Sequence, residues 1–146
     1  MTAVMPDITV RRNRRPGCVA VIATHPCWPA ALPQHGPGKK HLRRIALCAW
    51  QISLARRHPQ RLLRGLIHSD GARVVNRFRT VLPSGRVARY EYVRYFFTNY
   101  SRDIRAIFCD HCDLVGVGWT QSSYKNISVA RRESVARLDS FIGPKR

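Results

Sequence analysis

The stretch from Leu62 to Gly71 reads Leu-Leu-Arg-Gly-Leu-Ile-His-Ser-Asp-Gly. It is an apolar run with one glycine inside it, and it ends in an acid followed by a second glycine. This pattern predicts a short buried helix that carries Asp70 to a functional surface. Gly65 fits a close contact between two helices because it has no Cβ, and Gly71 fits a C-terminal stop with a positive φ. An ordinary core helix with a capping Asp-Gly turn is the alternative interpretation.

The residues after this stretch alternate with the two-residue period of a β-strand. Three arginines share one parity and three apolar residues share the other, which predicts one wet basic face and one packed face. The arginines are Arg73, Arg77 and Arg79, and the apolar residues are Val74, Phe78 and Leu82. The expected elements that follow are a turn at 82–85, a return strand at 86–99, a helix at 102–114 with Ser101 as N-cap, a short hairpin at 119–130 and a closing helix at 132–142.

The residues before the stretch divide into two parts. Residues 1–38 hold six of the nine prolines together with four arginines, which predicts a disordered or loosely attached segment, although 18–23 could form a short strand. Residues 39–60 predict an amphipathic helix up to Arg57 and a linker at His58-Pro59. Two helices in succession resemble a helix–turn–helix in outline, but the second is too apolar for a DNA groove.

The charge of the chain points to a polyanionic partner. Its 146 residues include 26 Lys and Arg against 8 Asp and Glu, a net charge of +18. The excess is +3 over residues 1–38, +6 over 39–60 and +9 over 61–146, so the expected folded part is itself basic. A positive charge of this size attracts phosphate groups over long distances, so nucleic acid is the expected partner. A ribosomal or nucleoid-type basic protein is an alternative.

The cysteines and the hydropathy of the chain indicate the cellular compartment in which we expect the protein. The odd number of five cysteines, without regular spacing or a secretory leader, predicts reduced thiols in a cytoplasmic protein. Cys109 and Cys112 have the spacing of half a zinc site, but no second pair accompanies them, which favours buried thiols on a helix. No apolar run approaches the length that spans a membrane, so we expect no membrane association.

From Arg61 onward the expected order is helix, strand, strand, helix, strand, strand, helix. This order and the Leu63–Gly71 segment resemble the LAGLIDADG homing endonuclease family, in particular the endonuclease domains of inteins. The segment departs from the family motif at Arg64, His68 and Ser69. The resemblance implies an α+β fold, a single αββαββα repeat over 61–146 with a basic antiparallel sheet.

The resemblance also implies an activity, the Mg²⁺-dependent, site-specific cleavage of double-stranded DNA by a homodimer. One Asp70 from each chain would bind the metal, with the carbonyl of Ser69 as a further ligand. His68 either orients water or caps the motif helix. The implied dimer contacts are Leu63, Gly65 and Leu66, and the implied basic catalytic residues are Arg131 and Arg132.

The predicted DNA-binding surface is the sheet, because arginines read guanine and hold phosphates. The same surface would serve a non-cleaving transcriptional regulator or an RNA-binding intron maturase, and these remain the alternative functions. Gln121 either positions water or is a solvated strand residue. The predicted DNA-binding side chains are Arg73, Arg77, Arg79, Arg89 and Arg94 in the long hairpin and Gln121, Ser123 and Lys125 in the short one.

Overall fold

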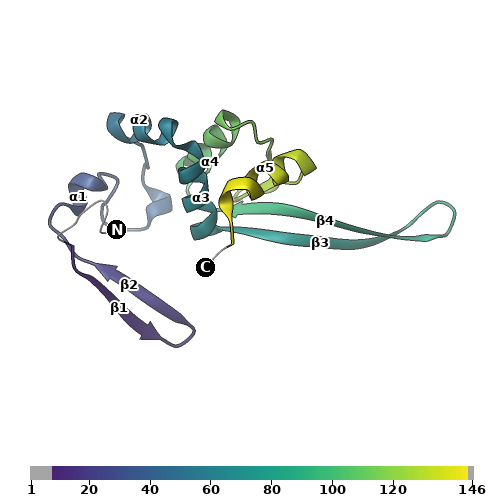
Figure 1. The fold of residues 1–146 in the computed structure, drawn as a ribbon, viewed down its shortest axis with the longest axis horizontal. Helices are drawn as coiled ribbons and strands as arrows, with labels where there is room; N and C mark the ends of the chain where they lie inside the picture. The colour runs from purple at the N-terminus through teal and green to yellow at the C-terminus, as the bar shows by residue number, and fades with distance from the viewer. Residues whose placement is uncertain (1–7, 145–146) are drawn as a thin grey trace. The chain divides into compact units, whose positions relative to one another are not determined.

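The computed structural model describes residues 8–144, and these fall into two compact units that meet in sequence at Pro37 and Gly38. Figure 1 shows the elements of both units. The first seven residues of the Pro/Arg-rich segment and the last two of the expected 61–146 domain lie outside the described residues. No helix in the described part of the chain is long and apolar enough to cross a membrane.

The first unit contains a β-hairpin, although disorder or loose attachment is expected from its sequence. Strands β1 (Val10–Arg15) and β2 (Cys18–Ala23) pair antiparallel, and a short helix α1 (Trp28–Ala31) follows. The turn consists of Pro16 and Gly17, and Gly17 has a φ of 74°. Proline followed by a positive-φ glycine suits a tight turn, so this proline connects the two strands rather than interrupting one.

The second unit begins with a helix that is shorter than expected. A single helix over 39–57 is wrong, because the structure has a 3₁₀ turn (Lys40–Leu42), an extended segment and then α2 (Ala49–Arg57). The backbone N–H of Ile45 donates to Asp103 Oδ2 at 2.6 Å, which ties the segment to a distant residue instead of to a helical turn. At Cys48 the backbone N–H donates to the side chain of Gln51 at 3.1 Å and starts α2 there.

The rest of the second unit follows the expected order of elements, and its α+β class is confirmed. Strands β3, β4, β6 and β5 form an antiparallel sheet in that spatial order. Helices α3, α4 and α5 lie together on one side of the β3–β4 pair (Figure 1). The bounds are α3 (Pro59–Asp70), β3 (Gly71–Val81), β4 (Val87–Thr98), α4 (Arg102–Leu114), β5 (Thr120–Gln121), β6 (Asn126–Val129) and α5 (Arg132–Ile142).

The hydrophobic core lies between these helices and the sheet. Leu63 of α3 and Leu138 of α5 have no exposed surface, and the rings of Phe97 and Phe108 stack with centroids 4.4 Å apart. Cys109 and Cys112 are free, buried thiols of α4, and burial raises the pKa of Cys109 to about 11. Each helix therefore reaches the core through its apolar stripe, and the two cysteines belong to that stripe.

Gly71 ends α3, but its conformation differs from the one expected. Its φ is −109° and its ψ is 167°, so the prediction of a positive φ is wrong. Space is the physical reason for glycine here, because a Cβ would lie 2.8 Å from the Cα of Ile67. The chain turns directly from the helix into β3, and a side chain would collide with the preceding helical turn.

The β3–β4 hairpin reaches beyond the helices as a two-stranded arm (Figure 1). Strand β6 pairs only with Tyr95–Thr98 of β4, so the outer part of the hairpin has no third strand. The predicted turn after Leu82 is confirmed: Gly85 N–H donates to the Leu82 carbonyl at 2.8 Å, and Leu82 N–H donates to Arg86 at 2.9 Å. The arm thus carries side chains exposed on both of its faces.

Candidate nucleic-acid interface

The two faces of the hairpin are the reverse of those expected from the parity of β3. Residues directly opposite each other across a ladder share a face, and Arg73 lies opposite Tyr95. Both contact Asp139 of α5: Arg73 donates to its two carboxylate oxygens at 2.8 and 2.9 Å, and Tyr95 donates to Oδ1 at 2.6 Å. The face of β3 with Arg73 and the other arginines is therefore the one that faces the helices. Phe78 lies on the other face, where its side chain is 45% exposed to solvent.

The helices cover only the base of the hairpin. Farther along the arm, the face of β3 that carries the arginines is exposed. Arg77 pairs with Glu91 at 2.8 Å. Arg79 lies directly opposite Arg89 on the same face, and neither guanidinium has an acidic partner among residues 8–144. Like charges in directly opposed positions destabilise a strand pair. An anion such as a phosphate would relieve this repulsion, so the pair is a candidate phosphate contact.

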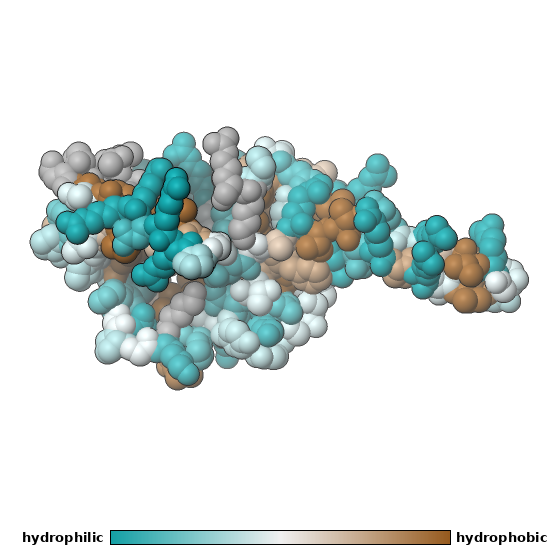
Figure 2. Space-filling model, turned by 90° about the horizontal axis from the view of Figure 1, so that it is seen from below, coloured by the Kyte–Doolittle hydropathy of each residue, from teal (hydrophilic) through white to brown (hydrophobic). Residues whose placement is uncertain are grey.

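The side of the sheet without helices carries a cluster that we call the aromatic face, consisting of Phe78, Tyr90, Tyr92, Arg94 and Phe96. The rings of Phe78 and Tyr90 stack with centroids 5.0 Å apart. The guanidinium carbon of Arg94 lies 4.6 Å from the ring centre of Phe96 and 5.6 Å from that of Tyr92. Arg94 also donates to Ser128 Oγ at 2.7 Å. Arg89 and Arg94 therefore lie on opposite faces, which the sequence leaves open. Seen from below, the arm shows hydrophobic patches between hydrophilic side chains (Figure 2).

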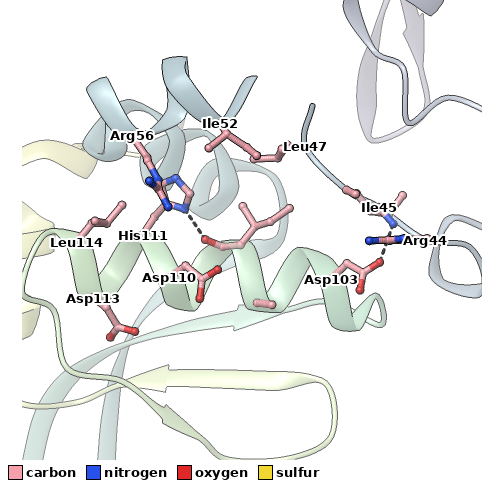
Figure 3. Close-up of a pocket in the computed structure, with 13 residues that line it drawn as sticks. Arg44, Ile45, Leu47, Ile52, Arg56, Asp103, Asp110, His111, Asp113 and Leu114 are labelled. Carbon is pink, nitrogen blue, oxygen red and sulfur yellow. Dashed lines mark hydrogen bonds between the residues drawn. The ribbon is translucent and has the colours of Figure 1, made fainter. Parts of the chain in front are cut away.

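Acidic side chains gather elsewhere. Three of the eight acids of the chain, Asp103, Asp110 and Asp113, line a pocket of about 620 Å³ between α4 and the segment 44–56 (Figure 3). Arg44 and Arg56 belong to the opposite wall of this pocket. Among the described sheet residues, none of the acids lies on the aromatic face. The charge distribution thus favours the sheet, rather than the α4 pocket, as the contact surface for a polyanion.

Asp70 is the last residue of α3 and is half-buried. Its Oδ2 accepts a 2.8 Å hydrogen bond from the side-chain amide of Asn99. The buried Asn99 is held in turn, because its Oδ1 accepts the N–H of Ser101 at 2.8 Å and its own N–H donates to the carbonyl of Lys125 at 2.9 Å. One asparagine therefore connects the end of α3, the end of β4 and the start of β6.

Lys125 is the predicted DNA-binding residue that shares Asn99 with Asp70, since its backbone carbonyl accepts the N–H of Asn99. Its Nζ donates to Tyr100 Oη at 3.1 Å and lies 4.9 and 5.8 Å from the ring centres of Tyr100 and Tyr124. The hydrogen bond from Lys125 lowers the pKa of Tyr100, and the same bond raises the pKa of Lys125. Asn99, Tyr100 and Tyr124 are not among the predicted site residues. Asn99 and Tyr100 belong to a polar and aromatic run at the strand–helix junction after β4, and Tyr124 lies in the turn between β5 and β6.

The other predicted catalytic residues lie away from Asp70. Arg131 and Arg132 follow the far end of β6, whereas Lys125 precedes its near end, so the strand separates them by roughly 10 Å or more. Gln121 is exposed in β5 opposite Ile127, and the Ser123 hydroxyl oxygen is buried without a partner among the described residues. Of these three predicted basic residues, Lys125 is the one that bonds Asn99, through its backbone carbonyl, while its ammonium lies at Tyr100.

The predicted dimer contacts differ in exposure. Leu63 is fully buried within its own chain and packs in the core, so it offers no surface to a partner. Leu66 is half-buried against the same core. Gly65 is exposed, and a Cβ there would meet no atom within 4 Å. A second chain that packs on α3 would meet Gly65 and its exposed neighbours.

The ends of α3 and α5 are joined by His68, whose Nε2 donates to the carbonyl of Ile142 at 3.1 Å. This contact fits a structural role better than the orientation of water. The hydroxyl of Ser69 donates to the carbonyl of Leu66 at 2.9 Å. No group of three His, Cys, Asp or Glu side chains that could hold a metal occurs within residues 8–144. Asp70 therefore belongs to no such group among the residues that the structure describes.

Comparisons of the chain with protein-family models, with curated proteins and with solved structures find no match. The function of the sheet must therefore be argued from its own geometry. Two features of the sheet point to a function, the Arg79–Arg89 pair on the arm and the Asp70–Asn99 contact at its base.

Proposed function

We propose that this chain binds double-stranded DNA with the β3–β4 hairpin. The observation that carries the proposal is the Arg79–Arg89 pair, two opposed cations on an exposed arm without an acidic partner among the described residues. The major groove of B-DNA admits a two-stranded β-ribbon, and the outer part of this hairpin is such a ribbon. Phosphates beside the groove would relieve the repulsion between the two guanidiniums.

The overall charge supports the same partner. Residues 71–98 contain six arginines and one glutamate, a net charge of +5 on the hairpin alone. Arg77 is the one arginine of the arm that pairs with that glutamate, and the pair is largely exposed. Such a surface binds phosphate backbones with a strong dependence on salt. Direct contacts between arginines and guanine edges would add sequence preference.

A second candidate function, phosphodiester cleavage, is favoured by the position of Asp70. Its carboxylate is fixed at the end of the sheet by Asn99, whose own N–H donates to the backbone carbonyl of Lys125. Mg²⁺, which takes one or two carboxylates together with substrate oxygens and water, would neutralise charge on the scissile phosphate. Since one chain supplies a single acid here, cleavage of both strands requires a homodimer with one Asp70 from each copy. The resemblance to LAGLIDADG endonucleases is consistent with this arrangement.

A selection of bound duplexes from random DNA, in Ca²⁺ and then in Mg²⁺, tests both functions. Enrichment of defined sites supports duplex binding, and cutting of those sites after addition of Mg²⁺ supports the endonuclease. Enriched sites that stay uncut would instead indicate a transcriptional regulator. No enrichment from duplex DNA, with enrichment from a parallel RNA pool, would indicate an RNA-binding protein such as a maturase.

A further inference from the structure

We infer that the aromatic face binds unpaired bases of a nucleic acid strand. This inference rests on the proposed nucleic-acid binding and adds a second type of substrate, a single-stranded segment, on the side of the arm opposite Arg79 and Arg89. On this side of the arm, aromatic rings are exposed to solvent at positions where polar side chains are more usual. Phe78 is 45% exposed and Tyr90 is 44% exposed, at directly opposed positions of the ladder.

The rings lie in a row along the hairpin, with Arg94 between Tyr92 and Phe96. Along β4, Tyr90, Tyr92 and Phe96 point to the same side, because they are separated by even numbers of residues. Phe78 of β3 stacks on Tyr90 and meets the ring of Tyr92 edge-on with centroids 6.1 Å apart. Every base has a flat face that stacks on such rings irrespective of sequence. A strand laid along β4 would therefore find successive stacking positions.

Charge on this face complements a polyanion. Arg94 lies between Tyr92 and Phe96 in sequence, with its guanidinium over both rings, and its bond to Ser128 holds the guanidinium there. Among the described residues, no acid shares this face. A guanidinium stacked on aromatic rings can itself stack on a base or contact a phosphate. The face thus combines stacking with positive charge, as single-strand-binding surfaces do.

A duplex would not use these rings in the same way. Bases of a duplex are stacked on one another, and their flat faces are inaccessible without strand opening. Unpaired DNA and unpaired RNA share the chemistry that the aromatic face requires. The two sources differ in the sugar, which the experiment distinguishes by using both.

The test measures fluorescence anisotropy with an unstructured oligo-dT, an unstructured oligo-U and a DNA duplex, each about 12 nucleotides or base pairs long, within the range of single-strand sites. The variants are Phe78→Ala and Tyr90→Ala, alone and together. Val81→Ala/Val87→Ala is the matched control, because these exposed apolar residues face each other on the opposite side of the same arm. Tyr90→Phe keeps the ring and serves as the conservative replacement.

Each alanine is expected to weaken single-strand binding about tenfold, while duplex affinity changes less than about twofold. The control variant and Tyr90→Phe should bind single strands like the wild type. A preference for oligo-U over oligo-dT assigns the site to RNA, and the reverse assigns it to DNA.

Two results refute the aromatic site, and a third refutes the proposed function on which it rests. Unchanged single-strand affinity in the double alanine variant, with duplex binding intact, refutes the aromatic site and leaves the proposed function standing. A changed oligomeric state of that variant in sedimentation, with all nucleic-acid affinities unchanged, identifies the aromatic face as a protein interface. Absence of binding to all three probes by the wild type refutes the proposed function itself.

Discussion

The side-chain amide of Asn99 donates a 2.8 Å hydrogen bond to Oδ2 of Asp70 and so fixes the carboxylate at the end of α3 against the end of β4. Asn99 is itself 4% exposed, and its Oδ1 is occupied by the N–H of Ser101. The amide therefore cannot rotate without leaving a buried group unpaired, which costs about 1–3 kcal/mol. The orientation of Asp70 is thus set by the core and not by solvent.

Asp70→Asn should abolish cleavage and leave duplex binding within about twofold of the wild type. The substitution keeps the size of the side chain but removes the negative charge that a metal requires. Asp110→Asn, an exposed acid of α4, is the control and should cleave normally. A plasmid cleavage assay in Mg²⁺, read beside binding in Ca²⁺, separates the two activities. Cleavage that persists in Asp70→Asn would remove Asp70 from the reaction.

Arg79→Gln/Arg89→Gln should weaken duplex binding and make it less sensitive to salt. Each lost phosphate contact reduces the slope of log K against log salt by about 0.9, so two contacts reduce it by about 2. The fold should not suffer, because the opposed guanidiniums of Arg79 and Arg89 repel each other. Arg57→Gln, an exposed arginine of α2, is the control for loss of charge alone. Equal slopes in both variants would show that the arm makes no specific phosphate contact.

Local patterns in the sequence predict much of the second unit. Ser101 caps α4 as expected, since its hydroxyl accepts the N–H of Ile104 at 3.4 Å. The turn after Leu82 closes the hairpin as expected. The closing helix ends after Ile142 as expected, and Gly143 follows it with a φ of 67°. In each case the residues that decide the conformation lie within a few positions of one another, and this is why a pattern could identify them.

The errors concern contacts between residues far apart in the sequence. The parity of β3 shows that its two faces differ, but the helices α3 and α5 decide which face is covered, and Arg73 meets Asp139 across 66 residues. Asn99 reaches Asp70 across 29 residues. Ile45 leaves the helical pattern for a bond to Asp103, 58 residues away. A local sequence pattern cannot predict contacts between residues so far apart. The site at Asp70 could therefore be predicted only in part.

Gly71→Ala should lower the free energy of unfolding by about 1–3 kcal/mol, because the new Cβ would overlap the helix at Ile67. Gly65→Ala is the matched control within the same helix. In the monomer it should raise the free energy of unfolding by about 0.5–1 kcal/mol, since within one chain its Cβ meets no atom within 4 Å and alanine favours the helix. Urea denaturation of the two variants measures both. A loss of stability in Gly65→Ala would mean that another molecule already packs on this glycine.

The same variant tests the proposed dimer. If two copies of α3 pack together at Gly65, the added methyl group separates their backbones and weakens self-association. Sedimentation over a range of concentrations should then show a larger dissociation constant for Gly65→Ala than for the wild type. An unchanged dissociation constant would place the dimer contact elsewhere on the chain.

Asp139 should make the stability of the second unit depend on pH below about 4. Hydrogen bonds from Arg73, together with the one from Tyr95, hold the pKa of Asp139 below its usual value of 3.8. The folded state therefore favours the carboxylate, and this stabilisation is complete above the unfolded-state pKa and is lost as the pH falls through the folded-state pKa. Because Arg73 and Asp139 are 46% and 35% exposed, we expect only about 1 kcal/mol.

Asp139→Asn should accordingly lose about 1 kcal/mol of unfolding free energy at pH 6, and the difference from the wild type should shrink toward zero near pH 2. Urea denaturation at several pH values measures the difference, with Asp110→Asn as an exposed acid on another helix. The direction of this pH dependence is decisive. A carboxylate with a lowered pKa stabilises the fold only at pH values where it is ionised. A deficit that grows toward low pH would show that Asp139 is not held as a carboxylate by Arg73.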